Sequence, residues 1–173
     1  LMPELKVKTL LQKAKVVQDS LKKKGIDLLL VYAPGKGASC KEFIEDKYVH
    51  PVKNTNHNLF AANSKDLNLN YLDLYPYFEK LKPTSPHALF PKFGHHWSYY
   101  GECLAVDTII KHIEKLHNCD MPAVFWPKIE VVDTARSRDA DVLKSMNLYT
   151  NPEQNMQLAY PLIQFENDSV KNT

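Results

Sequence analysis

Arginine is scarce in this sequence, and its scarcity narrows the class of partner. Of the 22 basic residues in the 173-residue chain, two are arginines, Arg136 and Arg138, and the net charge is +2. Proteins that read nucleic acids rely on the two-pronged contacts of arginine to bases and phosphates. We therefore expect no nucleic-acid partner. The two arginines lie beside Asp139 and Asp141, and we interpret the four residues as a solvated charge cluster.

Cysteine pairs and long apolar runs are missing as well. The three cysteines, Cys40, Cys103 and Cys119, form no CxxC motif, so we expect buried thiols rather than a cysteine-ligated zinc. No apolar run approaches the roughly 18 residues that a membrane-spanning helix needs. The first residues, LMPELKVKTLL, resemble neither a signal peptide nor a natural start. A mature or trimmed chain would read this way, so a missing signal says little about compartment.

What is present favours one α/β domain over residues 1–173. The hydrophobic content of 44% is enough to bury a core. Residues 5–24 carry apolar side chains every three or four positions, which predicts an amphipathic helix ending at Gly25. The run IDLLLVYA, residues 26–33, predicts a buried strand. The expected buried face of the helix comprises Val7, Leu10, Leu11, Ala14, Val17 and Leu21.

Further elements follow along the chain. Residues 45–66 are polar and read as an irregular excursion over the surface, and residues 70–82 predict a short strand running into a short helix. Ser98 is placed to cap a helix that extends to about Leu116, with Cys103 in its core-facing stripe beside Val106, Ile110 and Ile113. PAVFW is a weak strand candidate, and the segment after it reads as a loop into a short helix.

The stretch FGHHW, residues 93–97, has three interpretations. In a structural one, Trp97 fills a gap and the histidines form a polar rim. In a metal-binding one, imidazole would ligate zinc or copper, but adjacent residues usually point apart and no nearby histidine or aspartate completes a site, so we predict none. In an acid–base one, a histidine just before a helix is exposed to substrate and titrates near neutrality.

GHHWSYYG followed by an amphipathic helix resembles a known motif, D/G-x-H-W-S/T/N-x-x-G. It occurs in the SGNH-hydrolase-like proteins of alginate O-acetylation and in their "DHHW" relatives. LKKKGIDLLLVYAPGKGA resembles the helix, strand and P-x-K loop of that family, and NYLDLYPYFEKLK resembles its V-D-L strand and short helix. The resemblance covers roughly residues 5–118, with a vaguer likeness in DADVLKSMNL.

The resemblance implies a flavodoxin-like three-layer α/β/α sandwich that transfers or hydrolyses O-acetyl groups without a cofactor. The substrate would be a cell-envelope or extracellular polysaccharide or an acetylated sugar, in the periplasm or cell envelope, with envelope proteins as partners. His96 corresponds to the general base of a Ser-His-Asp triad. Lys36 and His95 would contact substrate, and Trp97 would stack on a sugar ring; a solvated lysine and a buried tryptophan are the alternatives.

Two positions depart from the family pattern. Gly94 stands where the acetyltransferases have the aspartate that orients the histidine, and Asp73 is a candidate replacement. No G-D-S block occurs; the nearest imitation ends in Ser169, a candidate nucleophile within FENDSVKNT. We expect the chain to lack the last strand and serine block of the fold, as a fragment or a form without its catalytic half. The rival hypothesis is a non-catalytic carbohydrate-binding or scaffold domain, and a histidine-dependent metal protein is a remoter one.

Overall fold

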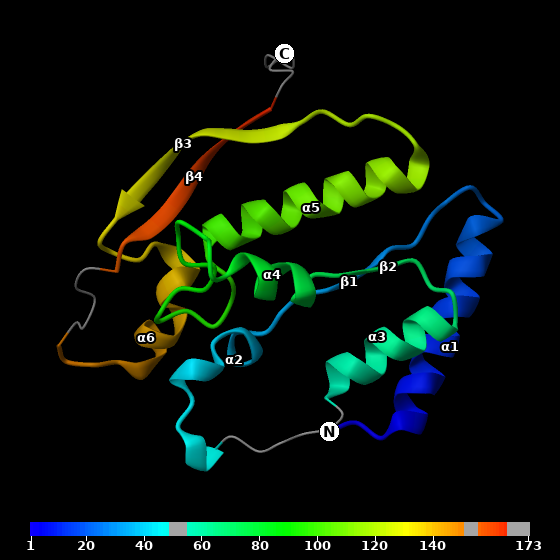
Figure 1. Cartoon of the computed structure of the whole chain (residues 1–173), viewed down its shortest axis with the longest axis horizontal. Helices are drawn as coiled ribbons and strands as arrows, with labels where there is room; N and C mark the ends of the chain where they lie inside the picture. The colour runs from blue at the N-terminus through cyan, green and yellow to red at the C-terminus, as the bar shows by residue number, and fades with distance from the viewer. Residues whose placement is uncertain (49–54, 151–155, 166–173) are drawn as a thin grey trace. The chain divides into compact units, whose positions relative to one another are not determined.

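The computed structural model describes residues 1–48, 55–150 and 156–165 (Figure 1). The chain divides into two compact units, Leu1–Tyr77 and Phe78–Thr173. The single domain expected over residues 1–173 stays a prediction. Among the described helices, none combines the length and apolar character needed to cross a membrane.

The first unit contains a pair of parallel strands, as the helix–glycine–strand order predicts. Leu30 lies opposite Tyr71 and Tyr32 opposite Asp73. Both strands are shorter than the apolar runs in the sequence, and residues 56–66 form a helix where we expected irregular chain. The elements are α1 (Glu4–Lys22), β1 (Leu30–Tyr32), α2 (Lys36–Ser39), η1 (Lys41–Phe43), η2 (Asp46–Tyr48), α3 (Asn56–Asp66) and β2 (Tyr71–Asp73). Helix α4 (Tyr75–Leu81) contains the boundary between the units.

Helix α1 packs against α3, as Figure 1 shows, but through a narrower face than predicted. Val7 and Leu11 are buried with Leu69, whereas Leu10 and Val17 are exposed. Because a helix turns once in 3.6 residues, the positions 7, 11, 14 and 18 lie along one side, and the sequence puts glutamine at the last of them. The helix ends before Gly25, as predicted, and Gly25 has a left-handed φ of 72°.

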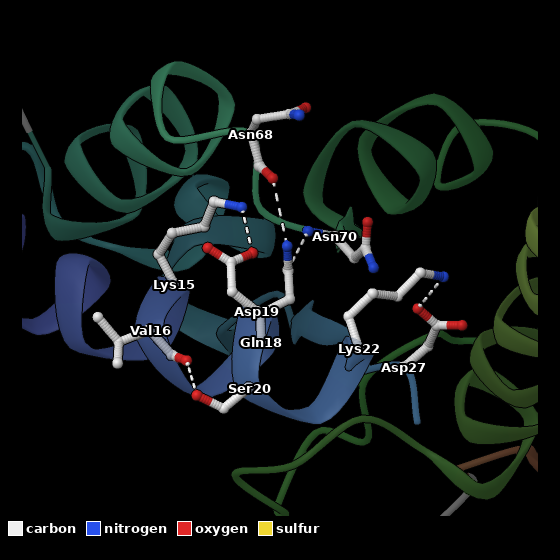
Figure 2. A network of polar contacts seen from close by, with 9 residues as sticks. All are labelled: Lys15, Val16, Gln18, Asp19, Ser20, Lys22, Asp27, Asn68 and Asn70. Carbon is white, nitrogen blue, oxygen red and sulfur yellow. Dashed lines mark hydrogen bonds and ion pairs between the residues drawn. The ribbon is translucent and has the colours of Figure 1, made fainter. Parts of the chain in front are cut away.

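Gln18 extends this contact with polar bonds instead of apolar packing (Figure 2). Its buried amide donates from Nε2 to the Asn68 carbonyl oxygen at 3.4 Å. Its Oε1 accepts from the backbone N–H of Asn70 at 2.7 Å. Asn70 directly precedes β2, so the glutamine ties α1 to the start of that strand. Leaving a partly buried backbone N–H unpaired is unfavourable, and Gln18 prevents this for Asn70.

The second unit places a pair of antiparallel strands beside a long helix (Figure 1). The predicted weak strand PAVFW belongs to a strand of 9 residues, and its partner is the apolar segment near the end of the chain. The register shifts between Phe125 and Lys128, where Pro127 cannot donate a ladder hydrogen bond. The elements are α5 (Tyr99–His117), β3 (Val124–Val132), η3 (Ser137–Ala140), α6 (Asp141–Met146) and β4 (Leu158–Phe165).

Helix α5 begins as predicted. The Ser98 hydroxyl accepts from the Gly101 N–H at 3.0 Å and donates to the Ala88 carbonyl at 2.7 Å. Cys103 is buried, which confirms it as a core residue, while Val106 is exposed. Gly101 is needed for packing: a Cβ there would lie 2.6 Å from the Leu89 carbonyl oxygen. The glycine of the H-W-x-x-x-G motif thus lets α5 approach the preceding loop closely.

Candidate active site

The histidine loop, residues 93–97, is held in place by Gly94, which packs closely against the Pro91 ring and the backbone of Arg138. A Cβ on Gly94 would lie 2.7 Å from Pro91 Cγ and 2.9 Å from the Arg138 carbonyl oxygen. Neither neighbour is the flexible tip of a side chain, so no larger residue fits without movement of the chain. An aspartate at this position, as in the family pattern, is therefore incompatible with the local packing.

The segment that crowds Gly94 also carries an acid to the loop. Phe93 accepts hydrogen bonds at its carbonyl from the N–H groups of Val142 at 3.1 Å and Leu143 at 3.3 Å. These bonds hold the start of α6 against the histidine loop. Asp141, the first residue of α6, consequently reaches His95 although the two are 46 positions apart.

His95 and Asp141 form a two-point pair. Asp141 Oδ1 accepts from the His95 backbone N–H at 3.1 Å, and Oδ2 pairs with the His95 Nδ1 atom. Asp141 Oδ1 also accepts from the Val142 N–H at 2.7 Å. Burial alone would raise the pKa of the Asp141 carboxyl, but the backbone bonds from His95 and Val142 and the His95 imidazole together lower it. The acid is therefore ionised at neutral pH.

A carboxylate on Nδ1 gives an imidazole a defined orientation. It fixes the ring and its tautomer, and it leaves Nε2 available to take a proton from a nucleophile. The His95 side chain is 61% exposed, so that nitrogen is accessible. The geometry is that of the histidine–acid half of a triad.

His96 and Trp97 occupy the positions that the motif marks as functional. The His96 ring lies 3.6 Å from the His95 ring, centroid to centroid, and tilted by 44°. No hydrogen bond joins His96 to a carboxylate within the described part of the second unit. Trp97 is half-buried and stacks on Phe78 at 5.8 Å and 23°. One face of the indole is thus engaged in packing, and its role as a sugar platform stays a prediction.

The arginines are organised rather than simply solvated. Arg136 makes a two-pronged pair with Glu130, at 3.0 and 2.8 Å, and lies 4.7 Å from the centroid of the Tyr160 ring. Arg138 pairs with Glu102 on α5 and lies 4.4 Å from the centroid of the Tyr99 ring. Both guanidinium groups therefore fix the segment before α6, which is the segment that positions Asp141.

Asp139 is completely buried in the same segment. Within the described residues, neither of its carboxylate oxygens has a hydrogen bond of good geometry. Burial raises the pKa of this carboxyl, and the nearby Tyr160 hydroxyl and Arg138 offset only part of that effect. Burial also raises the pKa of Tyr160, to about 12. The sequence interpretation of Asp139 as a solvated charge is wrong.

The first unit holds its own histidine–acid pair. Asp73 accepts from His57 Nε2 at 3.0 and 2.9 Å through its two oxygens, and from the Tyr75 N–H at 3.0 Å. The His57 ring stacks on Tyr75 at 3.7 Å and 17°. Asp73 therefore binds His57, and its role as the acid that orients His96 stays a prediction. Lys36 is the first residue of α2, in the loop that leaves β1, and Ser169 lies outside the described residues.

A family model describes this architecture. The model of the SGNH hydrolase-like domain, acetyltransferase AlgX, matches residues 3–159. This chain belongs to that family. The match extends past residue 118, where the sequence resemblance fades, and it includes both His95 and Asp141. The resemblance to the alginate O-acetylation proteins is therefore confirmed.

A solved structure supports the same fold. The chain is similar to the O-acetyltransferase domain of Pseudomonas putida AlgJ, with a TM-score of 0.64 and 20% sequence identity. The alignment covers 96% of this chain and 60% of that one, so this chain spans somewhat less than two thirds of the length of the AlgJ chain. The expected SGNH hydrolase-like α/β fold is confirmed. A search of curated proteins finds no match.

In this AlgX-family chain, the sequence motif identifies the two histidines but not Asp141, the acid that pairs with His95. Asp141 is 46 positions from His95 in the sequence and reaches it through the packing of α6, so no nearby residue in the sequence reveals it. The available signal was the likeness of DADVLKSMNL to the family, which places an acid-rich segment in the matched region. His57 gave no signal, because residues 45–66 read as irregular chain.

Proposed function

We propose that this chain supplies the histidine and acid of an O-acetyltransferase or acetylesterase that acts on a cell-envelope or extracellular polysaccharide. Membership of the AlgX family supports the acetyl-transfer chemistry. The observation that carries the proposal is the pairing of His95 Nδ1 with Asp141, with the rest of the imidazole exposed. The serine nucleophile lies outside the described residues, with Ser169 as the candidate in this sequence.

The reaction uses the histidine twice. Nε2 takes the proton of the serine hydroxyl as its oxygen attacks the acetyl carbonyl of a donor ester, and the same proton passes to the departing donor alcohol. A sugar hydroxyl, or water in the esterase, then attacks the acetyl-serine while the histidine takes its proton. Collapse returns that proton to the serine oxygen and releases the acetylated sugar or acetate. No cofactor is required.

Two histidines compete for this role. The family motif designates His96, which directly precedes Trp97. The geometry designates His95, because it is the histidine with a carboxylate on Nδ1. An imidazole without that partner has no fixed tautomer, and mis-set tautomers cost orders of magnitude in rate. We therefore assign the general base to His95 and place His96 and Trp97 beside the sugar, with Lys36 as a further substrate contact.

A non-catalytic carbohydrate-binding or scaffold domain is the second candidate. It is favoured by Gly94, whose contacts exclude the family's orienting aspartate. In that case the histidine loop and Trp97 would bind oligosaccharide without turnover. Periplasmic or envelope location and envelope-protein partners belong to both candidates.

Hydrolysis of p-nitrophenyl acetate separates them. The assay compares the chain with a version extended by whatever coding sequence follows Thr173, each with His95→Ala, His96→Ala and Asp141→Asn. We expect His95→Ala to lower kcat by about 100-fold or more in the active version, and Asp141→Asn to follow it. Loss confined to His96→Ala would return the base to the position that the motif marks. If neither version hydrolyses the ester but both bind oligosaccharide, the chain is a carbohydrate-binding domain.

A further inference from the structure

Three potential metal ligands converge beside α6. His95, His96 and Asp141 each offer one ligand atom, and these atoms all lie within 4.8 Å of one another. Both histidines are exposed and Asp141 is half-buried. The packing of the two rings, 3.6 Å apart, shows that these adjacent residues do not point away from each other.

We propose that His95, His96 and Asp141 bind a divalent transition metal ion of the zinc type. Two imidazoles and one carboxylate are the donors that zinc and its neighbours accept in sites with open positions. Mg²⁺ and Ca²⁺ prefer all-oxygen sites and would not compete. The exposure of both histidines leaves the remaining coordination positions to water or to a ligand from solution.

The backbone preorganises this donor set. Gly94 packs against the carbonyl oxygens of Arg138 and Asp139, where a Cβ would approach to 2.9 and 3.0 Å. The hydrogen bond from the His95 N–H to Asp141 Oδ1 fixes the acid in addition to its bond from the Val142 N–H. The three ligands thus belong to two segments that stay together without a metal, so little ordering remains to oppose binding.

Asp141 Oδ2 can bind either the His95 imidazole or a metal ion. Asp141 Oδ1 is held by backbone N–H groups, whereas Oδ2 faces the His95 imidazole. A metal between Oδ2 and the two rings would replace one side-chain contact and leave the backbone bonds intact. Backbone N–H groups on a ligating carboxylate are the kind of outer contact that orients it. This site does not depend on acetyl transfer, and its occupancy is measured without substrate.

Titration with Co²⁺ tests the site directly. We expect a saturable visible absorption at one equivalent of Co²⁺, displaced by one equivalent of Zn²⁺ and unaffected by excess Mg²⁺. His95→Ala, His96→Ala and Asp141→Asn should each weaken Co²⁺ binding by about tenfold or more. Asp141→Asn keeps an oxygen for the backbone N–H groups, so a folded protein is expected even if a histidine variant were unstable.

His117→Ala is the matched control, because His117 is an exposed histidine of the same unit in the last turn of α5. It should bind Co²⁺ like the unaltered chain. No saturation at one equivalent would overturn the proposal. So would binding that survives all three substitutions, or that is lost in the histidine variants and unchanged in Asp141→Asn.

Discussion

The two units each contain a histidine paired with an aspartate, and the pairs differ in every respect that governs reactivity. In the first unit the His57 and Asp73 side chains are 22% and 17% exposed, and the imidazole is stacked on Tyr75. In the second unit the His95 side chain is 61% exposed and lies beside another histidine. The proposed function therefore assigns a structural role to the first pair and the catalytic role to the second.

The hydrogen-bonded nitrogen reinforces that distinction. His57 uses Nε2 for both oxygens of Asp73, and its ring face is covered, so the pair closes the end of β2 against α3. His95 uses Nδ1 for Asp141, and its side chain is largely exposed. A histidine–acid pair is therefore informative about chemistry only together with its exposure and with the nitrogen that remains available.

The largest expected effect comes from the glycine that supports the functional pair. Gly94→Ala should destabilise the second unit by about 2–3 kcal/mol, because the added Cβ meets the Arg138 carbonyl oxygen and the Pro91 ring. Chemical denaturation measures the change. Gly37→Ala is the control, since nothing lies within 4 Å of a Cβ there. Equal stability of the two variants would contradict the packing described for residue 94.

Breaking the structural pair should have the next largest effect on stability. His57→Ala removes the stack on Tyr75 and leaves the half-buried Asp73 carboxylate with only its backbone bond. We expect a loss of about 1–2 kcal/mol in the free energy of unfolding. His95→Ala, at an exposed side chain, should change it by less than about 0.5 kcal/mol. A reversed order would remove the distinction between the pairs.

Substitution of the buried Asp139 should have a smaller effect on stability, and one that depends on pH. Because burial raises its pKa in the folded chain, the folded state binds more protons than the unfolded state as pH rises above about 4. The free energy of unfolding is therefore highest below about pH 4 and falls as the pH rises from there to the folded pKa of Asp139. Asp139→Asn should gain about 1 kcal/mol relative to the unaltered chain between pH 3 and pH 7. Urea unfolding at both values measures this, and a pH-independent difference would contradict the buried, ionisable state.

The smallest expected effect is a rise in melting temperature with zinc. A ligand that binds only the folded state, present at a free concentration equal to its Kd, stabilises that state by about 0.4 kcal/mol. The rise should appear in the unaltered chain and in His57→Ala, and should be absent in His95→Ala. Scanning fluorimetry with Zn²⁺ and with Mg²⁺ measures it, and an equal rise with both ions would contradict the site.

The sequence predicts the parts of the fold that depend on neighbouring residues. Ser98 caps α5, Gly25 follows α1 in a left-handed conformation, and the strand at residues 71–73 runs into a short helix. Capping oxygens and the freedom of glycine act within a few residues, so their effect is visible in the sequence. The family motif adds the histidine loop and the SGNH hydrolase-like fold.

The rest depends on contacts between distant segments. The acid partner of His95 comes from α6, and the burial of Asp139 follows from the packing of the segment before it. Proline in β3 reads as an end to the strand, yet the register shift between Phe125 and Lys128 lets the strand continue past it. Gln18 reads as the polar side of α1, yet it is buried where it bonds to Asn68 and Asn70.

The most direct test of the central distinction is acetyl-ester hydrolysis by His95→Ala and His57→Ala in whichever version, the chain or its extension past Thr173, hydrolyses p-nitrophenyl acetate, with rates corrected for the folded fraction. We predict that His95→Ala loses about 100-fold or more in kcat at unchanged stability. His57→Ala should keep its rate per folded molecule while it loses stability. A full rate in His95→Ala together with a loss of that size in His57→Ala would contradict the account.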